Sequence, residues 1–177
     1  MGIVDRVRNM LFAPKEEWPR IAAEPASVAS VYTGYVLLLA AVPAIGVLVG
    51  FRSIPFAVAN YLIALVMTYV IALVVDALAP KFGGEAGFVA ALKLSAYSYT
   101  AAFIGGIAHI LGSIGGPLVI AATIYAYYTF YLGAPVLKKC APDKAVLYTI
   151  VIVVVGIVIG MTIGIVFGRM GMAPAIG

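Results

Sequence analysis

Long apolar runs separated by short polar segments dominate the pattern of this chain. A helix needs about 20 mostly apolar residues to cross the hydrocarbon core of a bilayer, and five runs meet or approach that length. They lie at about 31–50, 54–75, 93–111, 117–136 and 145–167. Helix is the expected state, because a bilayer offers no water to satisfy free backbone groups. We therefore predict an all-α polytopic membrane protein whose five transmembrane helices form a bundle over residues 31–168.

Residues 1–30 have a different pattern, in which apolar side chains recur at helical spacing among charged ones. The apolar positions are Ile3, Val4, Val7, Met10 and Leu11. This spacing predicts a short amphipathic helix in the cytoplasmic membrane interface, and a partner-binding helix is the alternative. Aromatic rings are favourable at headgroup depth, and four of them are candidate interfacial anchors: Phe12, Trp18, Tyr128 and Tyr131.

Two of the connections between the apolar runs are very short. Residues 51–53 join the first two runs, and residues 112–116 join the third and fourth. The sequence therefore predicts two helical hairpins, while the longer loop after Asp76 contains Pro80 and the breaker pair Gly83–Gly84. Before the fifth run, Asp143 is a candidate N-cap.

Lysine and arginine residues concentrate on one side of the predicted bundle. With five crossings, one side holds nine basic residues and the other holds only Arg52 and Arg169. Basic residues collect in short cytoplasmic loops, so we place the N-terminus in the cytoplasm and the tail 169–177 outside the cell membrane. Hydrophobic residues are 64% of the chain and charged residues 10%. The net charge of +4 therefore indicates orientation in a membrane and contact with its lipids, and no nucleic-acid partner is expected.

The fifth run carries a regular glycine pattern. Four glycines occur at every fourth position: Gly156, Gly160, Gly164 and Gly168. Such a stripe allows another helix backbone to approach closely. Packing within the bundle and self-association through this run both remain open interpretations.

A few polar side chains fall within or at the ends of the apolar runs, where ionisable groups are costly. We interpret Asp76 and Lys93 as a helix-end ion pair, and His109 as a snorkelling or hydrogen-bonded group. Interhelical hydrogen bonds are expected from the remaining candidates, which are Asn60, Ser95, Ser98 and Thr100. The chain has one histidine and one cysteine, and no catalytic or metal-binding motif emerges, so no cofactor is expected.

Several ordered motifs resemble the Yip1 domain family in its short prokaryotic form. These are Leu11–Pro14 followed by Trp18, Tyr35 followed by Val42–Ile45, Leu92–Ser98, and Tyr131–Gly133 followed by Pro135–Leu137, Asp143–Ala145 and Tyr148. The resemblance implies a polytopic protein that self-associates or joins other membrane proteins. Eukaryotic relatives bind prenylated Rab GTPases and act in vesicle traffic. This chain lacks their Asp-Leu-Tyr-Gly-Pro motif, so that role is not carried over.

Three classes of function are compatible with these features. The favoured hypothesis is a non-enzymatic scaffold or adaptor in the cell's inner membrane, self-associating or binding other membrane proteins. The second is a small channel or transporter whose bundle or oligomer gathers the polar groups around a shared cavity. The third is a membrane-embedded enzyme acting, for example, on lipid, which a lipid-like substrate bound beside both His109 and Asp76 would support.

Overall fold

The computed structural model describes residues 1–169, and every regular secondary-structure element within this range is a helix. Four stretches are long and apolar enough to cross a membrane. They are Val28–Phe51, Ile54–Phe82, Phe88–Leu137 and Pro142–Val166. The structure therefore confirms an all-helical architecture suited to a membrane, while length and composition define four candidate spans and do not confirm five.

The first two stretches form a helical hairpin. The first joins α3 (Val28–Val31), the π-helical turn η1 (Tyr32–Val36) and α4 (Leu37–Phe51). Ser27 begins it with a capping box, which satisfies free N–H groups of the first turn. The second stretch joins α5 (Ile54–Leu78) to the 3₁₀ turn η2 (Ala79–Phe82). The reversal between them needs only Arg52 in the left-handed conformation and Ser53 as N-cap.

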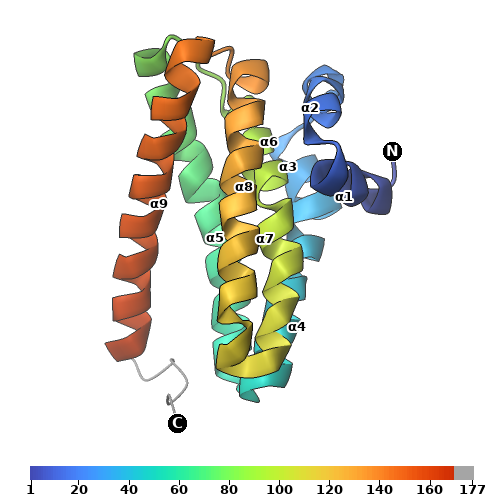
Figure 1. Cartoon of the computed structure of the whole chain (residues 1–177), viewed down its shortest axis with the longest axis vertical. Helices are drawn as coiled ribbons and strands as arrows, with labels where there is room; N and C mark the ends of the chain where they lie inside the picture. The colour runs from blue at the N-terminus through green and yellow to red at the C-terminus, as the bar shows by residue number, and fades with distance from the viewer. Residues whose placement is uncertain (170–177) are drawn as a thin grey trace.

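The third stretch, Phe88–Leu137, has 50 residues. A straight α-helix of that length would extend about 75 Å, far more than the roughly 30 Å of a hydrocarbon core. The stretch instead folds back at Gly112, whose φ of 62° and ψ of −138° favour glycine. One limb contains α6 (Phe88–Ser98), α7 (Thr100–Gly105) and the 3₁₀ segment η3 (Gly106–Gly115), and α8 (Gly116–Leu137) packs against it as the other limb (Figure 1).

The helix of the first limb starts earlier than the sequence predicted. It begins at Phe88, not at Lys93, because Val89–Leu92 continue the apolar pattern and Gly87 separates it from the loop. The limb also breaks at Tyr99, where ψ is 1°. The expected loop 112–116 is helical except for the reversal itself.

Glycines allow η3 to lie directly against α4. A Cβ on Gly50 would lie 1.8 Å from the carbonyl oxygen of His109, and one on Gly46 would lie 2.6 Å from that of Gly106. No side chain fits at either position. At this contact, close backbone approach replaces side-chain interdigitation.

The N-terminal segment forms two helices, where one amphipathic helix was expected. They are α1 (Ile3–Phe12) and α2 (Pro14–Ala23), and the chain bends between them at Ala13. Pro14 occupies the first position of α2, where its missing N–H costs little. Both helices pack against the bundle, α1 on α7 and α2 on α8 (Figure 1).

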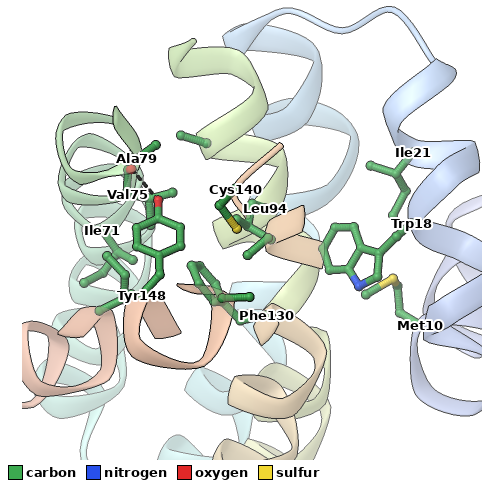
Figure 2. Close-up of a cluster of buried hydrophobic side chains, with 14 residues drawn as sticks. Met10, Trp18, Ile21, Ile71, Val75, Ala79, Leu94, Phe130, Cys140 and Tyr148 are labelled. Atoms are coloured by element: carbon green, nitrogen blue, oxygen red, sulfur yellow. Dashed lines mark hydrogen bonds between the residues drawn. The ribbon is translucent and has the colours of Figure 1, made fainter. Parts of the chain in front are cut away.

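The last helix, α9 (Pro142–Arg169), contacts the bundle mainly through its first half. There Tyr148 is fully buried and its hydroxyl donates a hydrogen bond to the carbonyl of Val75. Figure 2 shows this cluster continuing through Phe130 and Leu94 to Trp18 on α2. Further along, Figure 1 shows α9 separated from the other helices. The main core thus lies at the end of the bundle that carries α1 and α2.

Candidate functional site

A cavity of about 270 Å³ lies between α5, α7, η3 and α8, with Pro43 of α4 in its wall. Two predicted polar candidates, Asn60 and His109, line it together with Thr68 and Thr123. Asn60 comes from the second turn of α5 and His109 from η3. The short connection before α5 and the reversal within η3 lie at the same end of the bundle, away from α2, and they bring these two elements together there (Figure 1).

The hydrogen bonds around this cavity are incomplete. The Nδ1 atom of His109 lies 2.8 Å from the carbonyl oxygen of Gly106. A carbonyl can only accept, so Nδ1 carries the proton and Nε2 of the neutral ring is an acceptor. The Oδ1 atom of Asn60 is buried and has no hydrogen-bond partner in the part of the chain that the structure describes. The structure therefore confirms a hydrogen-bonded histidine but gives Asn60 no interhelical partner.

The polar candidates on α6 and α7 lie elsewhere. The hydroxyls of Thr100 and Tyr35 are 2.6 Å apart, which links α7 to η1 as an interhelical hydrogen bond. Ser95 and Ser98 are buried, but their hydroxyl oxygens have no partner among the described residues. Of the four side chains expected to bond between helices, Thr100 alone does so within residues 1–169.

The expected ion pair between Asp76 and Lys93 is wrong. Asp76 accepts a hydrogen bond of 2.7 Å from Lys138, and its Oδ1 also accepts from the backbone N–H of Gly87 at 2.6 Å. Lys138 is completely buried and also donates to the carbonyl of Gly87. Lys138, at the end of α8, thus joins the last turn of α5 to the loop after η2, because Asp76 and Gly87 both bind its ammonium group.

Lys93 interacts with backbone carbonyls and not with a carboxylate. Its ammonium donates to the carbonyl of Ile21 at 2.7 Å and to that of Glu24. These carbonyls belong to the C-terminal end of α2, where unpaired oxygens and the helix dipole favour a cation. Lys93 therefore attaches α2 to α6.

A second polar cluster under the N-terminal helices was missed by the sequence analysis. Arg6 is buried, donates to Glu17 and Glu24, and lies 5.6 Å from the ring centre of Tyr97. Asn9 also donates to Glu17, at 3.0 Å. One signal was available, because Arg6 precedes the buried Met10 by four residues and so shares its face of the helix. The partners of Arg6 are 11 and 18 residues away, which no helical period reveals.

Trp18 is not an interfacial anchor in this structure. Its indole is completely buried and donates a 3.0 Å hydrogen bond to the carbonyl of Thr129 on α8. Gly133 makes room for it, because a Cβ there would lie 2.5 Å from the ring. Figure 2 shows the ring directed into the core from α2. Three other proposed anchors have partly or largely exposed rings: Phe12, Tyr128 and Tyr131.

The glycine stripe of α9 is largely uncovered. A Cβ on Gly156 would make ordinary contact with Ile71 at 3.6 Å, but those on Gly160 and Gly164 would meet no atom of the described part of the chain within 4 Å. The surroundings of Gly168 and the tail 170–177 lie outside the described residues. Among residues 1–169, therefore, no other helix packs against the middle of the stripe.

Groups suited to metal chemistry are scattered. Among residues 1–169, no three histidine, cysteine, aspartate or glutamate side chains come close enough to hold a metal ion. The single cysteine, Cys140, is buried beneath the end of α8. The arrangement offers helix packing, hydrogen bonding and ion pairing, together with one partly polar cavity.

These features define a helical membrane protein, with apolar stretches long enough to span a bilayer and an N-terminal helix pair docked on one end of the bundle. The profile of the Yip1 domain matches residues 8–163, nearly the whole length. The chain therefore belongs to the Yip1 domain family, which is not a known family of enzymes. No curated protein and no solved structure matches it.

Proposed function

We propose that this protein is a non-enzymatic membrane scaffold or adaptor that self-associates through the glycine face of α9. The observation that carries this proposal is the open space beside Gly160 and Gly164. Exposed apolar residues on α9 need no partner, since lipid solvates them. Glycines at every fourth position form a flat surface that suits close approach of another helix.

The other glycine contacts in the chain support this assignment. Gly46, Gly50 and Gly106 each lie where a Cβ would collide with a neighbouring helix. Glycine in these positions permits backbone contact inside the bundle. Gly160 and Gly164 have the same spacing and chemistry but no neighbour among residues 1–169, and a second copy of α9 would supply one. Other membrane proteins with a small-residue face are the alternative partner.

Oligomerisation in bilayers tests this proposal. Donor- and acceptor-labelled copies reconstituted into liposomes should show energy transfer that falls as lipid dilutes the protein. The double variant Gly160→Leu/Gly164→Leu should lose the transfer. Gly34→Leu is the matched control, because a side chain there also meets nothing within 4 Å. Equal transfer from both variants would remove α9 as the interface, and absence of transfer in the unaltered protein would exclude self-association.

The same proposal includes five crossings with a cytoplasmic N-terminus. It is supported by the reversal at Gly112 and by the nine-to-two distribution of basic residues. Single cysteines placed at residues 16, 52 and 113 of a Cys140→Ala background should report the sides. A membrane-impermeant maleimide applied outside cells should label positions 52 and 113 and leave position 16 unlabelled. Labelling of positions 52 and 113 on different sides would overturn this topology.

A small channel or transporter is the second candidate function, and the cavity beside Asn60 and His109 is the observation that favours it. Asp76 and Lys93, the charged groups assigned to a shared cavity in that hypothesis, are absent from its lining. Flux of ions or small solutes from proteoliposomes would support a channel. A broad panel without flux would leave the scaffold proposal as the better account.

A further inference from the structure

A separate cavity, of about 300 Å³, lies between α2, α6 and the end of α8. Its charged lining residues are both lysines, Lys93 and Lys139, and no aspartate or glutamate among residues 1–169 lines it. The rest of the wall is apolar and consists of Ala22, Val89, Ala90, Val136 and Leu137. Two cations beside an apolar wall favour an anion that also carries a hydrocarbon part.

The buried ammonium group of Lys93 is only partly neutralised. It donates to the carbonyls of Ile21 and Glu24 at the C-terminal end of α2, and such a helix end is equivalent to about half a negative charge. The carboxylate of Glu24 is already paired with Arg6. An ammonium group has three protons to donate, so one of them has no acceptor among residues 1–169. A phosphate oxygen would supply both the missing charge and the missing acceptor.

The start of α6 adds free backbone donors to the same cavity. Ala91 is the first residue of this helix whose N–H finds a backbone acceptor, the carbonyl of Gly87, and no side chain caps the helix. The N–H groups of the three preceding residues therefore lack partners in the described part of the chain. Two of these residues, Val89 and Ala90, line the cavity. Free N–H groups and the helix dipole make this end of α6 favourable for a phosphate.

The cavity lies where the headgroups of a bilayer are expected. Val89 and Leu137 are at the two ends of the candidate membrane-spanning stretch Phe88–Leu137, which folds back at Gly112. Both ends of the stretch therefore meet on the side of the bundle that carries α2 (Figure 1). In the topology proposed above this is the cytoplasmic side, where basic pockets between membrane helices bind anionic headgroups.

We propose that this cavity binds the phosphate of an anionic phospholipid, held by Lys93, Lys139 and the first turn of α6. Val136 and Leu137 contact the glycerol and the first acyl carbons, while the rest of the acyl chains extends into the bilayer, because the volume is near the lower end of ligand pockets. Lys139 is available for this contact, since both side chains in its ion pair with Glu85 are exposed and such pairs contribute little. The site does not depend on self-association through α9.

Native mass spectrometry of the full-length protein in detergent tests the proposal with lipids that have identical acyl chains. Phosphatidylglycerol should bind at least about tenfold more tightly than phosphatidylcholine, whose choline adds a cation that finds no carboxylate in the cavity wall. Inorganic phosphate has no apolar part, so it should not displace phosphatidylglycerol at the same concentration. Equal affinity for the two lipids would overturn the proposal, and displacement by inorganic phosphate would assign the site to free phosphate and overturn the assignment to a lipid.

Three variants then separate this cavity from a general attraction of lipid to basic residues. Lys139→Met should weaken phosphatidylglycerol binding about fivefold, the effect of roughly one lysine near an anionic headgroup. Lys144→Met is the matched control, because Lys144 is exposed in the first turn of α9 and does not line the cavity. Glu85→Gln should strengthen binding, because it releases Lys139 from a competing carboxylate. Trp18 fluorescence verifies that each variant folds, and equal affinities of Lys139→Met and Lys144→Met would overturn the proposal.

Discussion

Glu17 holds the N-terminal helices on the bundle, and its removal should release them. Its side chain is 1% exposed and pairs with Arg6, which is 7% exposed. It also accepts from Asn9 at 3.0 Å. Removing one member of a buried ion pair costs about 3–5 kcal/mol, because the other charge remains buried. Arg6 retains its bond to Glu24, so we expect about 3 kcal/mol for Glu17→Ala, or roughly two orders of magnitude in the docking equilibrium.

The single tryptophan of the chain provides the assay. Trp18 is completely buried against α8 when α2 is docked. In Glu17→Ala its emission should shift to longer wavelength, and aqueous acrylamide or brominated lipid should quench it more strongly. Glu16→Ala is the matched control, since Glu16 is exposed on the same helix and its loss should leave the spectrum unchanged.

The same cluster allows a double-mutant cycle. Arg6→Met/Glu17→Leu replaces both charges by apolar groups of similar size, so it should cost less than the sum of the two single substitutions. Identical spectra and quenching for Glu17→Ala and Glu16→Ala would refute the assignment of docking to this ion pair. Strict additivity of Arg6→Met and Glu17→Leu would show that the two side chains are not coupled.

Three further predictions concern the same end of the bundle. Lys138→Met should destabilise the protein by about 3 kcal/mol, because the carboxylate of Asp76 loses its buried ammonium partner. Lys139→Met is the control, since this side chain is 66% exposed, and it should change the free energy of unfolding by less than about 0.5 kcal/mol. Equal effects of the two substitutions in thermal unfolding would contradict this prediction. Gly133→Ala should cost about 1–3 kcal/mol, because the new Cβ would lie 2.5 Å from the indole ring of Trp18 and would displace it. Gly116→Ala should show no loss of thermal stability, because its Cβ would meet no described atom within 4 Å. The hydrogen bond from the Arg6 guanidinium lowers the pKa of Glu24 below its ordinary 4.5, so the stabilisation by this pair is present above the ordinary value and is lost as the pH falls through the lowered one. Tryptophan emission should therefore be constant from pH 7 to 5 and change only below about 4.5. A transition above pH 5 that is absent in Glu24→Gln would contradict the lowered pKa.

Much of the helical framework is readable from the sequence because lipid imposes a strong local rule. Every backbone group in an apolar run must find its partner within the helix, so the runs beginning near residues 31 and 54 correspond to α3–α4 and α5 within a few residues. The short connection at 51–53 likewise requires neighbouring antiparallel helices. Patterns of this kind depend on residues close together in the chain.

The reversal within the third stretch was also predicted, because the short connection expected at residues 112–116 contains Gly112, where the chain turns. The start of this stretch, at Phe88, was harder to predict. Lys93 was taken as a boundary because it is charged, yet it lies inside the helix and finds carbonyl acceptors on α2.

The sequence by itself determined the helical class, the apolar stretches and the small residues that permit close packing. The tertiary structure decided which polar groups meet: Arg6 with Glu17, and Asp76 with Lys138 across 62 residues. It also decided that Trp18 enters the core. From the sequence alone, an amphipathic ring in a short interfacial segment is equally compatible with contact with lipid. Local periodicity specifies which face of a helix is apolar, but partners for a charge or an indole come from distant segments, and only the folded chain brings these segments within hydrogen-bonding distance.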